Sequence, residues 1–339
     1  MTAESSSSDR SGTTTAHIGL VLGAGGVAGG AFHAGVLAAL EESIGWDPRR
    51  ADVIVGTSAG SITGATLRAG LSAADVLARA TGTPVSAEGA RLLRGVGSPI
   101  SPPQRERGPG RQRPRADIAV TLARAAARPF SARPLALLAG LLPEGTIGTE
   151  FISESLASLH PGGWSGDALW ICAVRQRDGR LVVFGRDLRP SVADAVAASC
   201  AIPSFFRPVE IDDEAYIDGG VHSPTNADVL GRDGRIDLVV VSSPMSHAGS
   251  VRRAGISPVR RWSRALLDAE AFRLRRRGAH VIAFQPTGED STVMGANAMD
   301  PRRRAAIARQ ARESTLRRLE RHDTRERLAP LLAAAAAAR

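Results

Sequence analysis

The sequence predicts an α/β fold with a mostly parallel central sheet. Short apolar runs that suit strands alternate with longer segments of helical periodicity, which is the pattern of a parallel sheet covered by helices. The chain has 339 residues and is 43% hydrophobic, so it can bury a large core. Two of the strand-like runs also end in glycine-rich turns, at residues 23–30 and 56–60.

The first part of the chain supplies two strand–helix units. Residues 17–23 are predicted to form a buried strand, which the glycine-rich turn at 23–30 joins to a helix at 31–44. The second unit comprises a strand at 53–56 and a helix at 59–69, and helical periodicity continues over 72–81.

Residues 83–115 break this alternation. Proline, glycine and arginine crowd this segment, which predicts an irregular insert. Two apolar helices are predicted to follow, at 116–128 and 133–142, so the insert extends to about 147. These helices either form a cap over a site or pack on the sheet, and packing is favoured because apolar helices usually cover a core.

The rest of the chain predicts further strands and helices. Asp178-Gly179 is a hairpin signal between strand-like runs at 169–176 and 180–185. Another strand-like run, at 215–218, ends in Gly219-Gly220. The other predicted elements are helices at 148–159, 191–199, 259–277 and 301–320, strands at 237–243 and 280–284, and a last helix or frayed segment from Leu331.

We therefore divide the chain into three parts. Residues 1–16 are polar and rich in serine and threonine, which predicts a disordered tail without the apolar region of a secretory signal. Residues 17–290 form the α/β domain with its insert, and residues 291–339 form an arginine-rich helical extension. No stretch approaches 18 apolar residues, so we expect no membrane span and a cytoplasmic protein, with peripheral membrane contact as an open alternative.

The composition narrows the chemistry. Every basic residue is arginine, so no lysine is present to act as a general base or to form a Schiff base. Cys172 and Cys200 are expected to be buried thiols, and no cysteine or histidine spacing suggests a metal site. We expect neither a metal nor a cofactor.

The net charge of +9 also bears on possible partners. Nucleic acid is not expected, because aromatic residues make up only 4% of the chain and no binding motif is present. An anionic membrane surface is the more specific hypothesis, with the arginine-rich segment 104–115 as its best candidate.

Ser58 is the most distinctive candidate for catalysis. It lies in Gly56-Thr57-Ser58-Ala59-Gly60, directly after an apolar strand-like run. A strand that turns at once into a helix through such a Gly-x-Ser-x-Gly segment forms a nucleophile elbow. The elbow presents the hydroxyl where the amides of the next helix begin, which suits acyl transfer through a serine ester.

The glycine-rich turn after the first strand has two interpretations. Gly23-x-Gly25 resembles a dinucleotide-binding fingerprint, but Ala28 replaces its third glycine and no acidic residue ends the next strand. No Gly-Lys-Ser/Thr follows, which excludes a P-loop. The second interpretation is an oxyanion hole, in which the amides of Gly25–Val27 face the carbonyl oxygen of an ester that Ser58 attacks.

A serine nucleophile also needs a proton acceptor. A triad would use one of the later histidines, of which His247 is the best placed because it follows a strand. Asp218 is more distinctive, since it ends a strand before Gly219-Gly220, where the backbone can turn sharply. Both hypotheses stay open on the residues alone. The histidines after Ser58 are His160, His222, His247, His280 and His322.

Four motifs together resemble the patatin-like phospholipase family. Each motif is weak alone, but the set in this order is specific and spans about residues 17–230. The motifs are Leu-Val-Leu-Gly-Ala-Gly-Gly with its helix at 20–37, Gly-Thr-Ser-Ala-Gly-Ser at 56–61, Ala-Ala-Ser-Cys-Ala-Ile-Pro at 197–203 and Asp218-Gly219-Gly220.

The resemblance implies a three-layer α/β/α sandwich and a serine acyl hydrolase of the phospholipase A or lysophospholipase kind. It implies a Ser58–Asp218 dyad, without histidine or metal, that cleaves carboxylic esters of phospholipids or related lipids through an acyl-enzyme. The implied oxyanion hole consists of the amides of Gly25, Gly26, Val27 and Ala59. The glycines that support the two turns are Gly56, Gly60, Gly219 and Gly220.

One position departs from the family's pattern. Many members carry arginine or lysine in the glycine-rich loop, where this chain has Ala28. The resemblance therefore implies an oxyanion hole without a cation in this loop. Two alternatives follow, namely a catalytically weak lipid-binding or scaffold protein on the same fold, and an esterase with a Ser-Asp-His triad.

Overall fold

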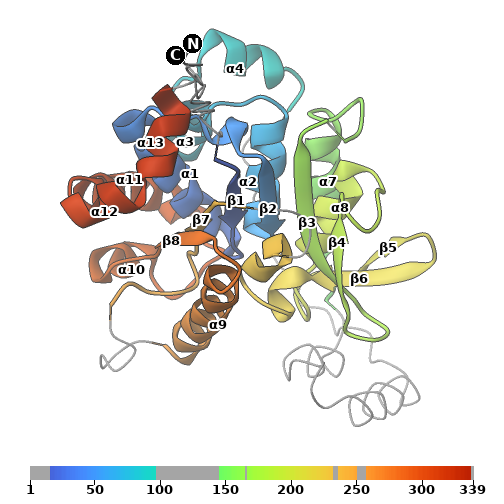
Figure 1. The fold of residues 1–339 in the computed structure, drawn as a ribbon. Helices are drawn as coiled ribbons and strands as arrows, with labels where there is room; N and C mark the ends of the chain where they lie inside the picture. The colour runs from blue at the N-terminus through green and yellow to red at the C-terminus, as the bar shows by residue number, and fades with distance from the viewer. Residues whose placement is uncertain (1–15, 97–144, 165, 232–235, 250–256, 337–339) are drawn as a thin grey trace, which may run out of the picture.

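The computed structural model of the protein describes residues 16–96, 145–164, 166–231, 236–249 and 257–336. Within these ranges, the centre is one eight-stranded sheet with the order β5-β6-β3-β2-β1-β7-β8 and with β4 paired to β3 (Figure 1). The strands are β1 (Ile18–Leu22), β2 (Val53–Thr57), β3 (Ala168–Arg175), β4 (Leu181–Phe184), β5 (Val209–Ile211), β6 (Glu214–Asp218), β7 (Leu238–Ser242) and β8 (His280–Phe284).

The middle of the sheet is parallel, as the sequence predicts. β3, β2, β1, β7 and β8 pair in parallel, whereas β4, β5 and β6 pair antiparallel to their neighbours. Leu22 lies opposite Gly56 on one side and Ser242 on the other. The carboxyl ends of these strands therefore share one edge, where the glycine-rich turn and Ser58 follow.

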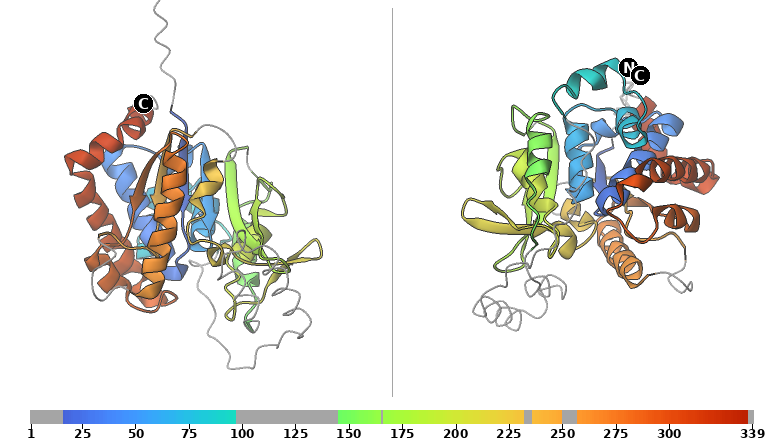
Figure 2. Two further views of the ribbon diagram at one scale, coloured as in Figure 1. Left: turned by 60° about the horizontal axis from the view of Figure 1, so that its bottom comes forward. Right: turned by 180° about the vertical axis from the view of Figure 1, so that it is seen from behind.

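Helices bury both faces of the sheet, which gives the three-layer α/β/α sandwich (Figure 2). Successive residues of a strand point to opposite faces. Leu20 accordingly packs in one apolar cluster with Phe32 of α1, whereas Val21 packs in another with Leu267 of α9. The longer helices are α1 (Gly26–Ile44), α2 (Ala59–Arg68), α3 (Ala73–Thr81), α9 (Pro258–Arg275) and α11 (Arg304–Leu319).

The shorter helices are α4 (Ala87–Leu92), α7 (Glu150–Ala157), α8 (Val192–Ser199), α10 (Gly288–Met294), α12 (His322–Arg327) and α13 (Ala329–Ala336). Three of the shorter helices, α4, α8 and α10, follow a serine or threonine whose side-chain oxygen accepts an otherwise unpartnered first-turn amide. Ser191 caps α8 in this way, and Thr287 and Asp290 form a reciprocal capping box at α10.

The structure departs from the sequence expectations in several elements. Helix α1 begins at Gly26, so most of the expected turn at 23–30 is helical. Glycine disfavours a helix by about 1 kcal/mol per residue, but here close packing outweighs this cost, since a Cβ at Gly29 would lie 3.2 Å from Pro244. Part of the expected irregular segment forms α4, and β5, α10 and α12 were not expected.

Several expectations concern residues outside the described ranges. These are the tail up to residue 15, the arginine-rich segment 104–115 and the two helices at 116–128 and 133–142.

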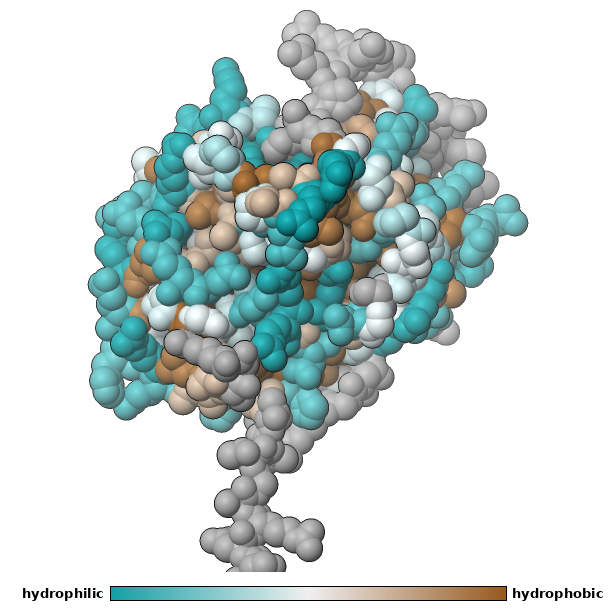
Figure 3. Space-filling model, turned by 90° about the horizontal axis from the view of Figure 1, so that it is seen from above, coloured by the Kyte–Doolittle hydropathy of each residue, from teal (hydrophilic) through white to brown (hydrophobic). Residues whose placement is uncertain are grey.

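The surface of the described residues is mainly polar. Figure 3 shows one face covered largely by hydrophilic side chains, with apolar ones in smaller groups between them. In the described part of the chain, no helix has both the length and the apolar character needed to cross a bilayer. The exposed large apolar side chains are Leu188, Val259, Phe272 and Leu332.

We expect the Gly35→Ala substitution to destabilise the fold by about 1–3 kcal/mol, because it overpacks the crossing of α1 and α11. A Cβ at Gly35 would clash with the carbonyl oxygen of Ala308 and lie 2.8 Å from the Cβ of Ala311. Denaturant titration measures the free energy of unfolding.

Gly30→Ala is the matched control on the same helix. A Cβ there meets no atom within 4 Å, so this change should leave stability unchanged or raise it by up to about 1 kcal/mol. Equal effects of the two substitutions would contradict the proposed close contact.

Candidate active site

Ser58 occupies a sharp turn between β2 and α2. Its backbone has φ 54° and ψ −122°, a conformation that costs a non-glycine residue about 1–3 kcal/mol. The flanking glycines make the turn possible, because a Cβ at Gly60 would clash with the carbonyl oxygen of Leu22 and one at Gly56 would lie 2.5 Å from the Cα of Ser61. The sequence thus places a serine where only a strained backbone fits.

Neighbouring side chains hold this strained backbone. The amide of Ser58 donates to Ser199 Oγ at 2.9 Å, and Ser199 Oγ in turn donates to the carbonyl of Cys172 at 2.7 Å. The carbonyl of Ser58 accepts from the amide and the hydroxyl of Ser61 at 2.8 and 2.7 Å. The amide and the carbonyl of Ser58 are therefore both hydrogen-bonded within the protein, and neither uses the serine hydroxyl.

Asp218 ends β6, which β3 separates from β2 in the sheet. Thr57 lies opposite Cys172 of β3, and Asp218 lies opposite the next residue, Ala173. The Asp218 carboxylate is 4% exposed and accepts the amide of Gly220 at 2.6 Å. Burial raises its pKa to about 6, against the opposing effect of hydrogen bonds from the Ser58 hydroxyl and the Gly220 amide. The structure thus brings together the serine and the aspartate that the sequence singled out.

The two glycines after Asp218 permit this approach. A Cβ at Gly219 would clash with the carbonyl oxygen of Cys172. At Gly220 a Cβ would lie only 2.9 Å from the carboxylate of Asp218. Both positions exclude larger residues from the turn that aims the carboxylate.

Asn226 ties the two halves of the site together, and the sequence analysis did not identify it. Its side-chain amide donates to Thr57 Oγ1 at 3.1 Å, to the Gly219 carbonyl at 3.2 Å and to the Ser223 carbonyl at 2.7 Å. Asn226 therefore joins the residue before the serine to the residue after the aspartate. Its φ of 49° suits asparagine, which adopts the left-handed region more readily than most residues.

Glu270 of α9 supports the same loop from behind. Its carboxylate accepts from Thr225 Oγ1 at 2.5 Å and from the Ala227 amide at 3.0 Å. Burial raises the pKa of this carboxyl. No sequence motif marks Glu270, which sits on the apolar side of an otherwise arginine-rich helix.

The glycine-rich loop presents amides beside Ser58. Gly26 has φ 60° and Val27 follows in the first turn of α1, where amides have no acceptor within the helix. The amide of Ala28 is already used, because it donates to the carbonyl of Ala298 at 2.9 Å. The amides of Gly23 and Ala24 are used as well, so the candidate donors are the amides of Gly25–Val27 and the amide of Ala59 at the start of α2.

His33 fixes this loop. Its Nε2 lies 2.7 Å from the Gly23 carbonyl and its Nδ1 lies 2.8 Å from Ser242 Oγ. Complete burial lowers its pKa to about 4, so the ring is neutral at neutral pH. The Nε2–H group therefore donates to the Gly23 carbonyl, and Nδ1 accepts from the hydroxyl of Ser242. His33 thus has a structural role.

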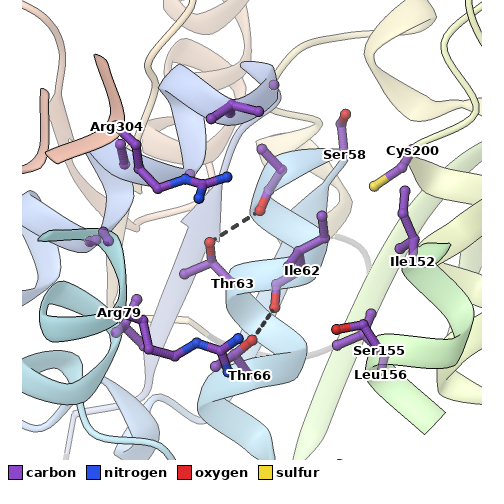
Figure 4. Close-up of a pocket in the computed structure, with 18 of the residues that line it drawn as sticks. Ser58, Ile62, Thr63, Thr66, Arg79, Ile152, Ser155, Leu156, Cys200 and Arg304 are labelled. Atoms are coloured by element: carbon purple, nitrogen blue, oxygen red, sulfur yellow. Dashed lines mark hydrogen bonds between the residues drawn. The ribbon is translucent and has the colours of Figure 1, made fainter. Parts of the chain in front are cut away.

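An apolar pocket of about 160 Å³ opens beside Ser58. Gly26, Val27 and Ala59 line it together with the serine, whereas Gly25 lines a separate pocket of about 740 Å³. In Figure 4 Ser58 stands at one end of the pocket, and Ile152 and Leu156 form part of one wall. Further apolar lining residues are Ile62, Phe151, Ile202 and Phe206.

No histidine of the chain lines this pocket, and all of them lie in the described ranges. His160 contacts the carbonyl of Ala65 at 3.0 Å, and His222 contacts Asn226 at 2.7 Å. His247 lines the separate pocket with Gly25, and His280 and His322 are exposed. Asp218 does not line the pocket either, but its pKa is lowered by the Ser58 hydroxyl, so the carboxylate is the better candidate for the proton acceptor.

Cys172 and Cys200 are buried thiols, as expected. Burial raises the pKa of Cys172 to about 12, so it is a poor nucleophile. Within the described ranges, no group of three or more histidine, cysteine and acidic side chains could hold a metal ion.

We expect the Asn226→Ala variant to lose about 2–3 kcal/mol of unfolding free energy, because Thr57 and Gly219 lose a buried donor. Alanine would also have to adopt the positive φ of this position, at a cost of about 1–2 kcal/mol. Denaturant titration of the purified parent and variant measures the difference in unfolding free energy, to which both effects contribute.

Asn226→Gly separates the two effects, since glycine removes the side chain without the φ penalty. It should be less stable than the parent but more stable than Asn226→Ala. Parent-like stability of Asn226→Gly would show that the three hydrogen bonds contribute nothing.

Comparison with known proteins identifies the family of this chain. A model of the family "Patatin-like phospholipase" matches residues 20–230, more than half of the chain. No match was found among curated proteins. Among solved structures, VipD from Legionella pneumophila is similar at 16% identity and a TM-score of 0.42, over 90% of this chain and 67% of VipD.

A second solved structure, the type III effector protein ExoU, is similar at 20% identity and a TM-score of 0.34. That similarity covers 92% of this chain and 53% of ExoU. The family match includes the glycine-rich loop, the serine elbow and Asp218-Gly219-Gly220. The chain belongs to the patatin-like phospholipase family.

Proposed function

We propose that the protein is a serine acyl hydrolase that cleaves carboxylic esters of acyl lipids with a Ser58–Asp218 dyad. The observation that carries the proposal is the position of Asp218, which is buried close enough to Ser58 for the serine hydroxyl to lower the pKa of its carboxyl, while Ser58 itself lines an apolar pocket. A nucleophile paired with a base next to a pocket that can admit a substrate is the arrangement that ester hydrolysis needs.

The first half-reaction forms an acyl-enzyme. Ser58 Oγ attacks the ester carbonyl carbon while its proton passes to Asp218. The amides of Gly26, Val27 and Ala59 stabilise the oxyanion that develops, with Gly25 beside them. Removal of one such donor typically costs about 10²–10³ in kcat. As the tetrahedral intermediate collapses, the C–O bond to the alcohol breaks and Asp218 returns the proton to the leaving oxygen.

The second half-reaction releases the acyl group. Asp218, again ionised, accepts a proton from water as the water oxygen attacks the acyl carbon. The same amides hold the second oxyanion, and the proton then returns to Ser58 Oγ as the ester bond breaks. The products are a carboxylic acid and the regenerated enzyme.

Burial suits Asp218 to this task. A carboxylate of ordinary pKa near 4 is a weak base, whereas a pKa of about 6 brings its basicity closer to neutral pH. The group is still mostly ionised at pH 7. Burial of the carboxyl, rather than the use of a histidine, thus brings the pKa of the base closer to neutral pH.

The alternative of a lipid-binding protein without turnover rests on Ala28. This residue is 1% exposed and contributes neither a cation nor an amide to the pocket. If the loop cation were needed for turnover, the protein would bind acyl lipids but not hydrolyse them.

We expect Ser58→Ala to abolish ester hydrolysis, because it removes the nucleophile. A panel of short-chain esters, lysophospholipids and phospholipids, followed by release of the carboxylic acid, measures the activity. A serine-directed phosphonate should add to the parent at Ser58, which mass spectrometry of the peptide detects.

Ser155→Ala, which changes another serine that lines the same pocket, is the control and should keep the phosphonate adduct. Retention of hydrolysis by Ser58→Ala would exclude the proposed nucleophile. If the parent and Ser58→Ala both bind lipid and neither hydrolyses it, the lipid-binding alternative would be favoured.

We expect kcat/KM to rise with pH through an apparent pKa of about 6, because Asp218 must be ionised to accept the proton. Asp218→Asn should remove the activity. A pH profile of the parent between pH 4.5 and 8 tests this, with His247→Ala as the control. Loss of activity in the histidine variant alone would favour a triad.

As pH rises, the folding stability contributed by Asp218 should fall, whereas kcat/KM should rise. The folded-state pKa of Asp218 is raised, so its contribution to stability is largest below about pH 4 and decreases as pH rises to about 6. Asp218→Asn removes this ionisation cost and should be more stable than the parent at pH 8, by up to about 3 kcal/mol. Lower stability at pH 8 would contradict the raised pKa.

A further inference from the structure

Two arginines line the pocket that holds Ser58. Arg79 lies near the end of α3, and Arg304 is the first residue of α11. Figure 4 shows both side chains reaching into the pocket from the side opposite Ile152 and Cys200. Two helices that are far apart in the sequence therefore place positive charge on one wall of an otherwise apolar space.

The setting makes these charges effective. Both side chains are partly buried, and burial lowers the pKa of each guanidinium. The positive charge of Arg304 lowers the pKa of Arg79 further. Arginine nevertheless stays protonated at physiological pH. A negative group between them would interact with two cations in a medium that screens charge less than water does.

The first turn of α11 adds to the positive potential. Helix N-termini carry partial positive charge, and this turn contains no acidic residue. Met299, which precedes the helix, lines the same pocket. This segment therefore forms one wall of the substrate pocket.

The position along α2 indicates the distance from the nucleophile. Thr63 and Thr66 line the pocket together with the two arginines, and in Figure 4 Arg304 lies nearer to Ser58 than Arg79 does. At the 1.5 Å rise of an α-helix, Thr63 lies about 7.5 Å and Thr66 about 12 Å along the axis from Ser58. In a glycerophospholipid, about six bonds separate the carbonyl carbon from phosphorus, which is about 7 Å in an extended chain.

We infer that this pocket selects acyl esters whose alcohol half carries a phosphate, and that Arg304, with Arg79 behind it, binds that phosphate. Arginine suits this task because its planar fork donates two hydrogen bonds to one phosphate group. The inference rests on the proposed function for its kinetic test but not for its binding test. The inference places the positive charge of the site on the wall formed by α3 and α11. The glycine-rich loop carries no charge there, because it has Ala28.

The kinetic test compares a 1-acylglycerol 3-phosphate with the 1-acylglycerol of the same chain, both as monomers. The parent should prefer the phosphate ester, and Arg304→Gln should lower this preference about tenfold or more, as loss of a hydrogen bond to a charged group does. Arg304→Lys should retain part of it. Arg309→Gln, an exposed position on the same helix, is the matched control and should leave the preference unchanged.

The binding test does not depend on turnover. It uses Ser58→Ala protein and the ether analogues 1-alkylglycerol 3-phosphate and 1-alkylglycerol, measured by titration calorimetry. The phosphate analogue should bind more tightly, and the difference should shrink about tenfold when Arg304→Gln is added. This result would support the phosphate subsite even if every ester proved inert.

Three outcomes would overturn the inference. In the first, Arg304→Gln lowers the values for charged and neutral ligands equally, which would give Arg304 a structural role. In the second, phosphate does not improve kcat/KM or binding at all. In the third, the protein prefers a negative group only when it is a carboxylate at the far end of the acyl group. A half-ester of a dicarboxylic acid tests this, and such a result would mean that the arginines bind the acyl half of the ester.

Discussion

The backbone of Ser58 is the constraint on which the site depends. A left-handed serine between a strand and a helix is stable only because Gly56 and Gly60 let α2 start against the ends of β1 and β2. Ser199 and Ser61 then satisfy the backbone groups of the turn. A relaxed turn would swing the hydroxyl away from both the carboxylate and the amides of α1, so packing of the sheet and reactivity of the serine are coupled.

The carboxylate imposes a second constraint. Burying Asp218 disfavours its charged form, yet the proposed chemistry uses that form. The surroundings compensate with a rigid turn rather than with a neighbouring cation, because Gly220, Asn226 and Glu270 order the backbone around it. The pKa of the Asp218 carboxyl therefore stays at about 6, whereas a neighbouring cation would lower it.

Part of this arrangement could be predicted from the sequence because it depends on local features. The Gly-x-Ser-x-Gly elbow, the strand before it and Asp218-Gly219-Gly220 each need particular residue types at fixed spacing. The start of α1 was misjudged because glycine disfavours helices in isolation, and only its contact with Pro244 explains Gly29 inside one. The three-residue strand β5 is too short for alternation to mark it.

The supporting residues could not be predicted, since their roles arise from long-range contacts. Asn226 reaches Thr57 across the sheet, and Glu270 reaches Thr225 from a helix on the far face. Arg304 belongs to a segment expected to be an extension, and its composition resembles any solvated arginine-rich helix. Only the packing of α11 on α1 places it beside the serine.

The position of that wall along the chain has a consequence for the family. The match to the family model ends at residue 230, but Ala298 orders the glycine-rich loop and Met299 and Arg304 line the pocket. The motifs of the reaction and the wall that faces the substrate are thus encoded in separate stretches. A substitution in the second stretch would therefore change the wall of the pocket and leave all four motifs intact.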